Sequence, residues 1–234
     1  MAKKGNSAHT KRISLGRNLK VEDRKGTVWL TTSKPGPHAK NSSMPLSMLL
    51  RDEVCVCSDL KEVKKLLNRG GVLIDGKAVK DYRRTIGIMD IISIPSMKKA
   101  YRMQIICSQL RAKEITEQQA KAKLCKVISK RTDSGAKITL TLHDGRNLIA
   151  DNKVKTGSTL KMSVPEFKLE EQIELKEGAK CFVIKGKHAG KIATLNKVSQ
   201  RAGAMPTRAE LSGSDGDFIT LTKYLIAVDD EFVK

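Results

Sequence analysis

The chain has 234 residues, with 45 Lys plus Arg against 25 Asp plus Glu, a formal net charge of +20 and an isoelectric point near 9.9. Such an excess of positive charge attracts polyanions, so a nucleic acid is the expected partner. Aromatic residues make up only 3% of the chain, which argues against extensive base stacking. The sequence shows no long apolar run and no signal peptide, which argues against a membrane protein.

Residues 1–43 are expected to form a basic N-terminal extension, because they hold ten basic and two acidic side chains and almost no apolar periodicity. The opening 18 residues, MAKKGNSAHTKRISLGRN, cannot bury enough apolar surface to fold alone, so we expect them to become ordered only on a partner. Trp29, in the strand-like run TVWL, indicates that part of the extension is pinned to another surface. The alternative is a frayed, solubilising tail. The candidate phosphate contacts here are Lys3, Lys4, Lys11, Arg12, Arg17, Lys20, His38 and Lys40.

Two helices are predicted at the start of the next segment, residues 44–105. Pro45 suits the first turn of one helix, which Leu46, Leu49 and Leu50 provide with an apolar stripe.

The second helix opens with a capping-box variant between Asp59 and Glu62, continues with apolar residues at helical spacing to Leu67, and stops at Gly70. Its apolar side chains face inward, so its basic side chains are left on the outer surface. The candidate contacts on the two helices are Arg51, Lys61, Lys64, Lys65 and Arg69.

A tight hairpin is predicted over residues 72–79, since Asp75-Gly76 supplies the positive φ angles that a type I′ turn demands. A third strand is expected over residues 88–94, ending at Pro95. The turns contribute three further candidate contacts, Lys77, Arg83 and Arg84. The unit therefore combines one apolar face with one cationic face.

This order of elements resembles the S-four domain, an RNA-binding module named after bacterial small-subunit ribosomal protein four. Its signature joins a basic helix, a glycine turn, an Asp-Gly-Lys hairpin and a closing Gly-x-x-Asp-hydrophobic strand. The matching positions are Gly70, Ile74, Asp75, Gly76, Lys77, Gly87, Asp90 and Ile91. The resemblance implies that the cationic face binds RNA; the alternative is an ordinary helix–hairpin unit with a solvated basic face.

Residues 106–170 are expected to form a small central β domain. The run 115–127 predicts a short basic helix, capped by Thr116, that leads into a strand. Alternating apolar residues predict strands over residues 138–142 and 160–164. The segment holds 13 basic and seven acidic side chains, so it offers a second surface for RNA.

Within the last segment, 171–234, residues 178–195 resemble a KOW motif. This motif consists of a strand, a basic glycine loop and a second strand, and it is found in ribosomal proteins and transcription elongation factors. The resemblance implies an SH3-like β-barrel, with Gly190 at a position of positive φ. The segment carries a net charge of only +1, so any RNA contact is expected to be local to the loop; the alternative is a barrel that mainly packs on the other domains. The candidate contacts of the loop are Lys185, Lys187, His188 and Lys191.

The sequence predicts an α+β multidomain chain with these four parts in order. This arrangement is similar to the archaeal and eukaryotic family of small-subunit ribosomal protein four. Gly-Pro-His at 36–38 and Leu-Arg-Asp at 50–52 also resemble the start of that family. The resemblance implies a single-copy structural constituent of the cytoplasmic small ribosomal subunit, with small-subunit rRNA and neighbouring ribosomal proteins as partners and no cofactor. The chain ends soon after the KOW-like unit, without the longer basic tail of eukaryotic members, which favours an archaeal source.

Two other function classes stay open. A KOW-bearing transcription or translation factor would leave the small subunit in high salt, whereas an integral component would stay. An RNA-modifying enzyme is suggested by His143-Asp144-Gly145-Arg146, which faintly resembles the catalytic-aspartate loop of a pseudouridine synthase. Only about 130 residues follow the S-four-like unit, however, which leaves no room for a catalytic domain of ordinary size.

Neither catalysis nor a metal site is indicated by the remaining polar residues. The four histidines are scattered through the extension and the loops, and none has a partner at nucleophile or relay spacing. The five cysteines are odd in number and lie in a chain without an export signal, which favours reduced thiols. Cys55-Val56-Cys57 lacks the second ligand pair that a zinc site needs.

Overall fold

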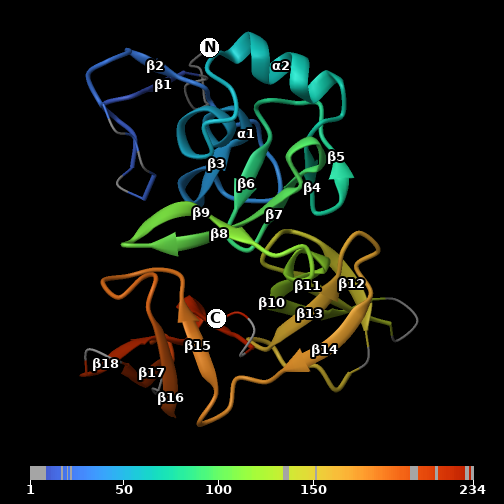
Figure 1. Cartoon of the computed structure of the whole chain (residues 1–234). Coiled ribbons are helices and arrows are strands. Elements are labelled where there is room, and N and C mark those ends of the chain that lie inside the picture. Colours follow the sequence, from blue (N-terminus) through green and yellow to red (C-terminus); the bar gives the residue numbers. More distant parts are fainter. Residues whose placement is uncertain are drawn as a thin grey trace, which may run out of the picture.

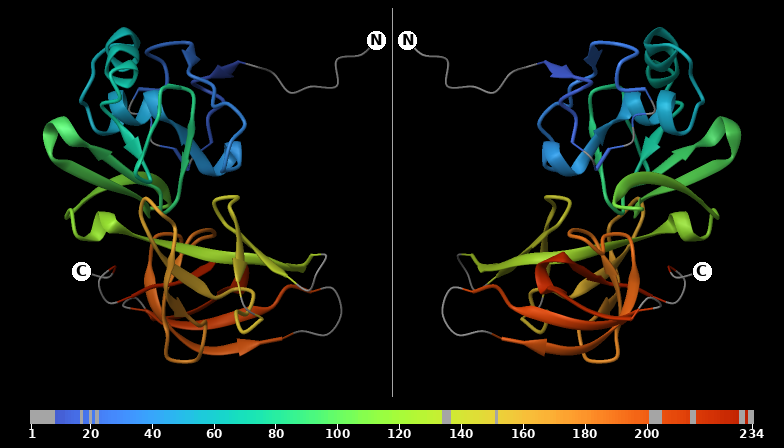
Figure 2. Two further views of the ribbon diagram at one scale, coloured as in Figure 1. Left: turned by 90° about the vertical axis from the view of Figure 1, so that its right-hand side faces the viewer. Right: turned by 90° about the vertical axis from the view of Figure 1, so that its left-hand side faces the viewer.

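The computed structural model describes residues 9–16, 18–19, 21, 23–133, 137–150, 152–200, 205–213, 216–229 and 232. In these residues the chain is mostly β-strand with few helices, and three five-stranded sheets make up most of it (Figure 1). One sheet lies with the helices in one half of the molecule, and the other two sheets form the second half (Figure 2). The expected α+β class is therefore weighted strongly towards β-structure.

The two predicted helices are present, and the second is the longer. α1 (Leu46–Met48) runs directly into η2 (Leu49–Glu53), a wider π-helical turn, and α2 (Leu60–Asn68) follows. The capping box between Asp59 and Glu62 is formed, and Gly70, with a φ of 72°, ends α2. Both local signals were therefore correct.

The N-terminal extension packs on this half of the molecule. β1 (Thr10–Lys11) pairs with β2 (Trp29–Leu30), and after η1 (Lys40–Ser42) the strand β3 (Ser43–Pro45) pairs with β6 (Thr85–Gly87). Leu19 and Leu30 are buried, and Leu19 belongs to the same apolar core as α1 and α2. This packing agrees with the indication from the run TVWL that part of the extension is pinned to another surface. Of the opening 18 residues, which were expected to order only on a partner, Thr10–Lys11 pair with β2 of the chain itself.

The sheet of the helical half has the order β5-β4-β7-β8-β9. Its strands are β4 (Leu73–Ile74), β5 (Lys77–Ala78), β7 (Ile91–Ile94), β8 (Lys99–Ile106) and β9 (Gln109–Ile115), with η3 (Pro95–Met97) between β7 and β8. Asp75 and Gly76 have φ angles of 48° and 74°, as a type I′ turn requires. The third strand starts later than predicted, because Met89 has a φ of 65° and breaks the extended run. Pairing of β8 with β9 carries the sheet past residue 105, where a boundary was expected.

The second sheet has the order β12-β11-β10-β13-β14. Its strands are β10 (Ala122–Thr132), β11 (Ile138–Leu142), β12 (Asn147–Ala150), β13 (Thr159–Ser163) and β14 (Leu169–Ile173). The run 115–127 has the predicted order of a Thr116 cap, a short helical segment and a strand: Thr116 accepts a hydrogen bond from the backbone N–H of Gln119, and the 3-10 turn η4 (Gln119–Lys121) leads into β10. The helical segment is a single turn, because residues from Ala122 onward pair with β13. β14 also crosses the expected boundary at residue 170.

The third sheet has the order β18-β17-β16-β15-β19. Its strands are β15 (Lys180–Val183), β16 (Ile192–Ser199), β17 (Arg208–Gly213), β18 (Gly216–Leu221) and β19 (Leu225–Ala227), with η5 (Thr222–Tyr224) before the last. Buried Met89, Leu124, Phe182 and Ile226 form one apolar cluster that joins all three sheets. The three sheets therefore hold the basic surfaces of the chain in a defined relation.

Candidate nucleic-acid interface

The outer face of α2 is a row of basic side chains. Val63 and Leu67 are buried against η2 and the first sheet, so the helix can turn only one face to solvent. That face carries the four predicted contacts, all exposed: Lys61, Lys64, Lys65 and Arg69. The Lys64 Nζ lies 4.9 Å from the centroid of the Tyr82 ring, which restrains this lysine near the neighbouring loop. The four side chains form a positive surface that runs along α2.

A groove of about 780 Å³ lies beside this helix, lined on one side by the β1–β2 segment and on the other by η2, the start of α2 and the loop before β6. We call it the arm groove. It brings together predicted contacts that lie far apart in the chain, and its main lining residues are Arg12, Trp29, Arg51, Leu60, Tyr82 and Arg83. Three guanidinium groups and two aromatic rings in one groove provide both charge and apolar surface, the combination that nucleic-acid sites use.

Protein contacts orient the three arginines of the groove. Arg51 Nε and Nη2 donate to the carboxylate of Asp52 at 2.7 and 3.1 Å, and this contact raises the Arg51 pKa. Arg83 Nε donates to the Thr32 carbonyl at 2.9 Å, and Arg12 donates to the Asp23 carbonyl. The guanidinium groups are therefore positioned by the fold, with part of their donor capacity already used.

The turn residues are distributed over a wider area. Lys77, at the tip of the β4–β5 hairpin, is exposed, with its Nζ 5.9 Å from the Phe167 ring. Arg84 is exposed on the far side of the helical half from α2, where it lines a small cavity with Asp75 and Asp144. Lys40 is exposed on η1, and Lys11 is exposed on β1. These side chains can reach a partner, but they do not share one continuous patch with the arm groove.

The glycine loop between β15 and β16 places only part of its predicted set outward. Lys185 and Lys187 are exposed, whereas Lys191 is half-buried. The His188 ring stacks on Phe218, with centroids 4.2 Å apart and planes 17° apart, so this imidazole is engaged by the protein. Gly190 has the predicted positive φ, 93°, and a β-carbon there would lie 2.7 Å from the Ile105 carbonyl oxygen. The loop therefore packs against the β8–β9 hairpin as well as presenting two lysines.

His38 is not an exposed contact, and this prediction is wrong. Its side chain is buried, and its Nε2 lies 2.9 Å from Asp90 Oδ2. Asp90 also accepts a hydrogen bond from the backbone N–H of Gly87 at 2.8 Å. Burial of His38 against Gly87 and Asp90 could not be read from the run SKPGPH, since these partners lie about 50 residues further along. Lys3, Lys4, Arg17 and Lys20 lie outside the described residues.

Sequence reasoning missed a buried ionic cluster, which we call the Lys123 cluster. Lys123 Nζ, on β10, donates to Asp75 at 2.7 Å, Asp90 at 2.7 Å and Asp144 at 3.3 Å. Arg146 completes it, 2.9 Å from Asp75 and 3.2 Å from Asp144. Asp75 and Asp90 occupy S-four signature positions, whereas Lys123, Asp144 and Arg146 come from the second sheet. The signature aspartates therefore join two sheets and are not available to an external ligand.

Electrostatics keep this cluster charged. Burial alone lowers the pKa of Lys123, but the carboxylates of Asp90 and Asp75 outweigh it, and the pKa ends above its usual value. For Asp90, burial is opposed by Lys123 and His38, and the pKa is lowered. Asp75 is the exception, since burial outweighs Lys123 and raises its pKa. No signal in AKAKLCKV distinguishes Lys123 from its exposed neighbour Lys121.

A second lysine ties the second and third sheets together. Lys126 Nζ donates to the backbone carbonyls of Thr222, Lys223 and Leu225 at 3.0, 3.1 and 2.7 Å. Burial lowers the pKa of Lys126 to about 8. Next to it, His143 accepts a hydrogen bond from the Lys126 backbone N–H at 3.2 Å and its Nε2 lies 3.1 Å from the Ile88 carbonyl. Burial, with the charge of Lys123, lowers the His143 pKa to about 4.

The described residues contain no group of three or more His, Cys, Asp or Glu arranged to hold a metal ion. The five cysteines are free thiols, and burial raises the pKa of Cys181 to about 12, which makes it a poor nucleophile. Within the same residues, no helix is long and apolar enough to cross a membrane.

The chain is similar to known proteins over nearly its whole length. The profile of the ribosomal family S4e matches residues 97–169. The small ribosomal subunit protein eS4 of Methanosphaera stadtmanae is 35% identical over 232 residues, covering 99% of this chain and 96% of the relative. The eS4 of Nanoarchaeum equitans is 34% identical, covering 96% of each. The crystal structure of the 30S ribosomal protein S4e from Thermoplasma acidophilum superposes with a TM-score of 0.70 at 30% identity, covering 81% of this chain and 96% of the other. The chain belongs to the eS4 family of small ribosomal subunit proteins.

Proposed function

We infer that this chain is a structural constituent of the small ribosomal subunit and that it binds small-subunit rRNA through the α2 face and the arm groove. Its eS4 relatives carry that subunit in their names, and the family is one of structural proteins, so the chain is not an enzyme. The observation that supports the RNA-binding surface is the row of four exposed basic side chains on α2, continued by the arginines of the groove.

The binding energy comes mainly from phosphate contacts. Each lysine or arginine that meets a phosphate releases condensed counterions, so affinity falls steeply with salt. A folded surface fixes where those charges lie, which lets the protein recognise the shape of a structured RNA. We propose the loop lysines Lys185 and Lys187 as a second, smaller contact, and neighbouring ribosomal proteins as the partners of the less basic surfaces.

Several finer points belong to the same proposal. The chain divides into an N-terminal extension (1–43), an S-four unit (44–105), a central β domain (106–170) and a KOW barrel (171–234), and acts in the cytoplasm as one copy per subunit. Support comes from the sheets and apolar clusters that follow this order, apart from the two strand pairings across residues 105 and 170. An archaeal source is supported by the archaeal relatives.

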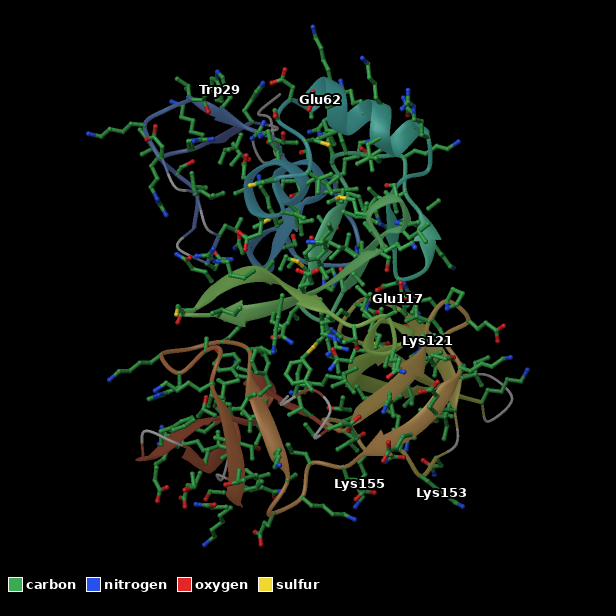
Figure 3. The ribbon with its side chains drawn as sticks, viewed as in Figure 1. Trp29, Glu62, Glu117, Lys121, Lys153 and Lys155 are labelled. Atoms are coloured by element: carbon green, nitrogen blue, oxygen red, sulfur yellow. The ribbon has the colours of Figure 1, made fainter. Side chains whose placement is uncertain are left out.

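The test replaces Lys61, Lys64, Lys65 and Arg69 by Ala and measures binding to small-subunit rRNA across a salt series. We expect weaker binding and a salt slope smaller by about 2.8–3.6 if all four side chains contact phosphates, at roughly 0.7–0.9 per contact. The control replaces three exposed lysines, Lys121, Lys153 and Lys155, which lie in the other half of the molecule from α2, and the two sets are compared by their effect per charge removed (Figure 3). The circular dichroism of the α2 variant must stay unchanged while its rRNA binding weakens. If the α2 set and the control set weaken rRNA binding equally per charge removed, this interface is refuted.

A further inference from the structure

Trp29 is exposed at the edge of the arm groove. It is the only tryptophan of the chain, and 56% of its surface is accessible to solvent. Val28 and Ile13, close by on the same β1–β2 segment, are exposed as well, at 64% and 73%. Large apolar side chains gathered at one surface mark an interaction site more often than isolated ones do.

The surroundings of this ring are cationic. Lys11 is paired with Trp29 across the β1–β2 register, and its Nζ lies 5.9 Å from the ring centroid. The His9 ring lies 5.4 Å away at an inclination of 55°, so it does not stack in parallel on the indole. Arg12 and Trp29 both line the arm groove, and Arg12 Nη1 donates to the Asp23 carbonyl, which orients the guanidinium group.

The balance of charge decides which class of partner fits. Among the described residues that line the arm groove, Arg12, Arg51 and Arg83 face a single acidic residue, Asp52, which is already paired with Arg51. An acidic polymer with flat apolar groups satisfies both the guanidinium groups and the ring. Single-stranded RNA has this composition, since phosphates alternate with bases that stack on aromatic side chains.

We propose that Trp29 stacks on an unpaired base of the RNA, with the adjoining phosphates bound by Lys11 and Arg12. This inference rests on the proposed function and refines it, because it assigns a single-stranded element of the RNA to the arm groove.

The sole tryptophan allows a site-specific test on the full chain. Titration with a short oligoadenylate is expected to quench the Trp29 emission saturably, since stacking on a base quenches indole fluorescence. Replacing Trp29 by Ala is expected to weaken oligoadenylate binding, measured by anisotropy of labelled RNA, by roughly five- to 150-fold. Trp29→Phe keeps a smaller aromatic ring and is less disruptive to folding than Trp29→Ala. It should bind oligoadenylate with an affinity between those of the natural chain and Trp29→Ala.

Val28→Ala is the matched control, because it removes exposed apolar surface next to Trp29 without removing a π-face. It should bind oligoadenylate as the natural chain does. The inference is overturned if saturating oligoadenylate leaves the emission unchanged, if Trp29→Ala binds as tightly as Val28→Ala, or if only a neighbouring ribosomal protein changes the emission. Failure of the proposed function is distinct, because the natural chain would then bind neither oligoadenylate nor a fully paired RNA hairpin.

Discussion

Replacing Lys123 by Met tests whether the Lys123 cluster holds the first and second sheets together. The substitution keeps an unbranched side chain, one atom shorter, but removes the cation that three buried carboxylates share. Removing one partner of a buried ion pair typically costs about 3–5 kcal/mol, because the other charge is left without compensation. Arg146 and His38 still contact these carboxylates, so we expect a loss near the lower end of that range at pH 7.

The pH dependence of this loss has a defined sign. A stranded aspartate can relieve its burial by taking up a proton, and doing so at pH 7 costs about 4 kcal/mol from a reference pKa near 3.9. That cost falls by about 1.4 kcal/mol for each unit of pH, so Lys123→Met should be less destabilising at pH 5 than at pH 7. In the natural chain the pKa of Lys123 is raised and that of Asp90 is lowered, so this pair keeps its charges over this range.

The assay is urea unfolding of the full chain, followed by circular dichroism, with equal m-values as the check on comparable unfolded states. Lys121→Met is the matched control, because Lys121 is exposed two residues earlier in the chain. Adding Asp75→Asn to Lys123→Met should restore part of the stability, as the amide can still accept the backbone hydrogen bond from Ile91 at 3.1 Å. The reasoning is refuted if Lys123→Met and Lys121→Met lose the same free energy of unfolding, or if Asp75→Asn destabilises both backgrounds equally.

Two further predictions concern His143 and the glycines of the turns. His143 has a folded pKa of about 4, below its ordinary 6.5, so the unfolded chain binds more protons than the folded chain as the pH falls between these values. The free energy of unfolding should therefore drop by about 2 kcal/mol from pH 7.5 to pH 5. In His143→Gln this contribution to the difference between the two pH values should be absent, as measured by urea unfolding at pH 7.5 and pH 5. An identical pH dependence in the two proteins would contradict that assignment. Gly70 and Gly76 have nearly equal φ angles, 72° and 74°, but a β-carbon at Gly76 would lie 2.5 Å from Pro165 Cβ, whereas none of the described atoms lies within 4 Å at Gly70. Gly70→Ala should therefore cost about 1–2 kcal/mol of backbone strain and Gly76→Ala clearly more, measured by thermal unfolding, and equal losses would show that the two sheets do not meet at this turn.

Local features of the fold were predictable from the residues that form them. The capping box at Asp59, the helix stop at Gly70 and the positive φ angles of Asp75 and Gly76 depend on side chains within a few positions, and all are present. The basic face of α2 follows from the same local periodicity, since burial of Val63 and Leu67 leaves the lysines outside. The S-four and KOW resemblances likewise identified the family, because they rest on short words in a particular order.

The sequence by itself thus determined the family, the positive charge, the main turns and the helix whose lysines face solvent. Only the tertiary structure decided which charged residues are free to meet RNA: Lys123 and Lys121 look alike in the chain, yet one is enclosed by three carboxylates and the other faces water. The same dependence on distant partners explains why His38 was expected to be an exposed contact and why the arm groove was not predicted. Burial of a polar side chain depends on partners brought from distant strands, such as Asp90 for His38, and no local pattern records that pairing.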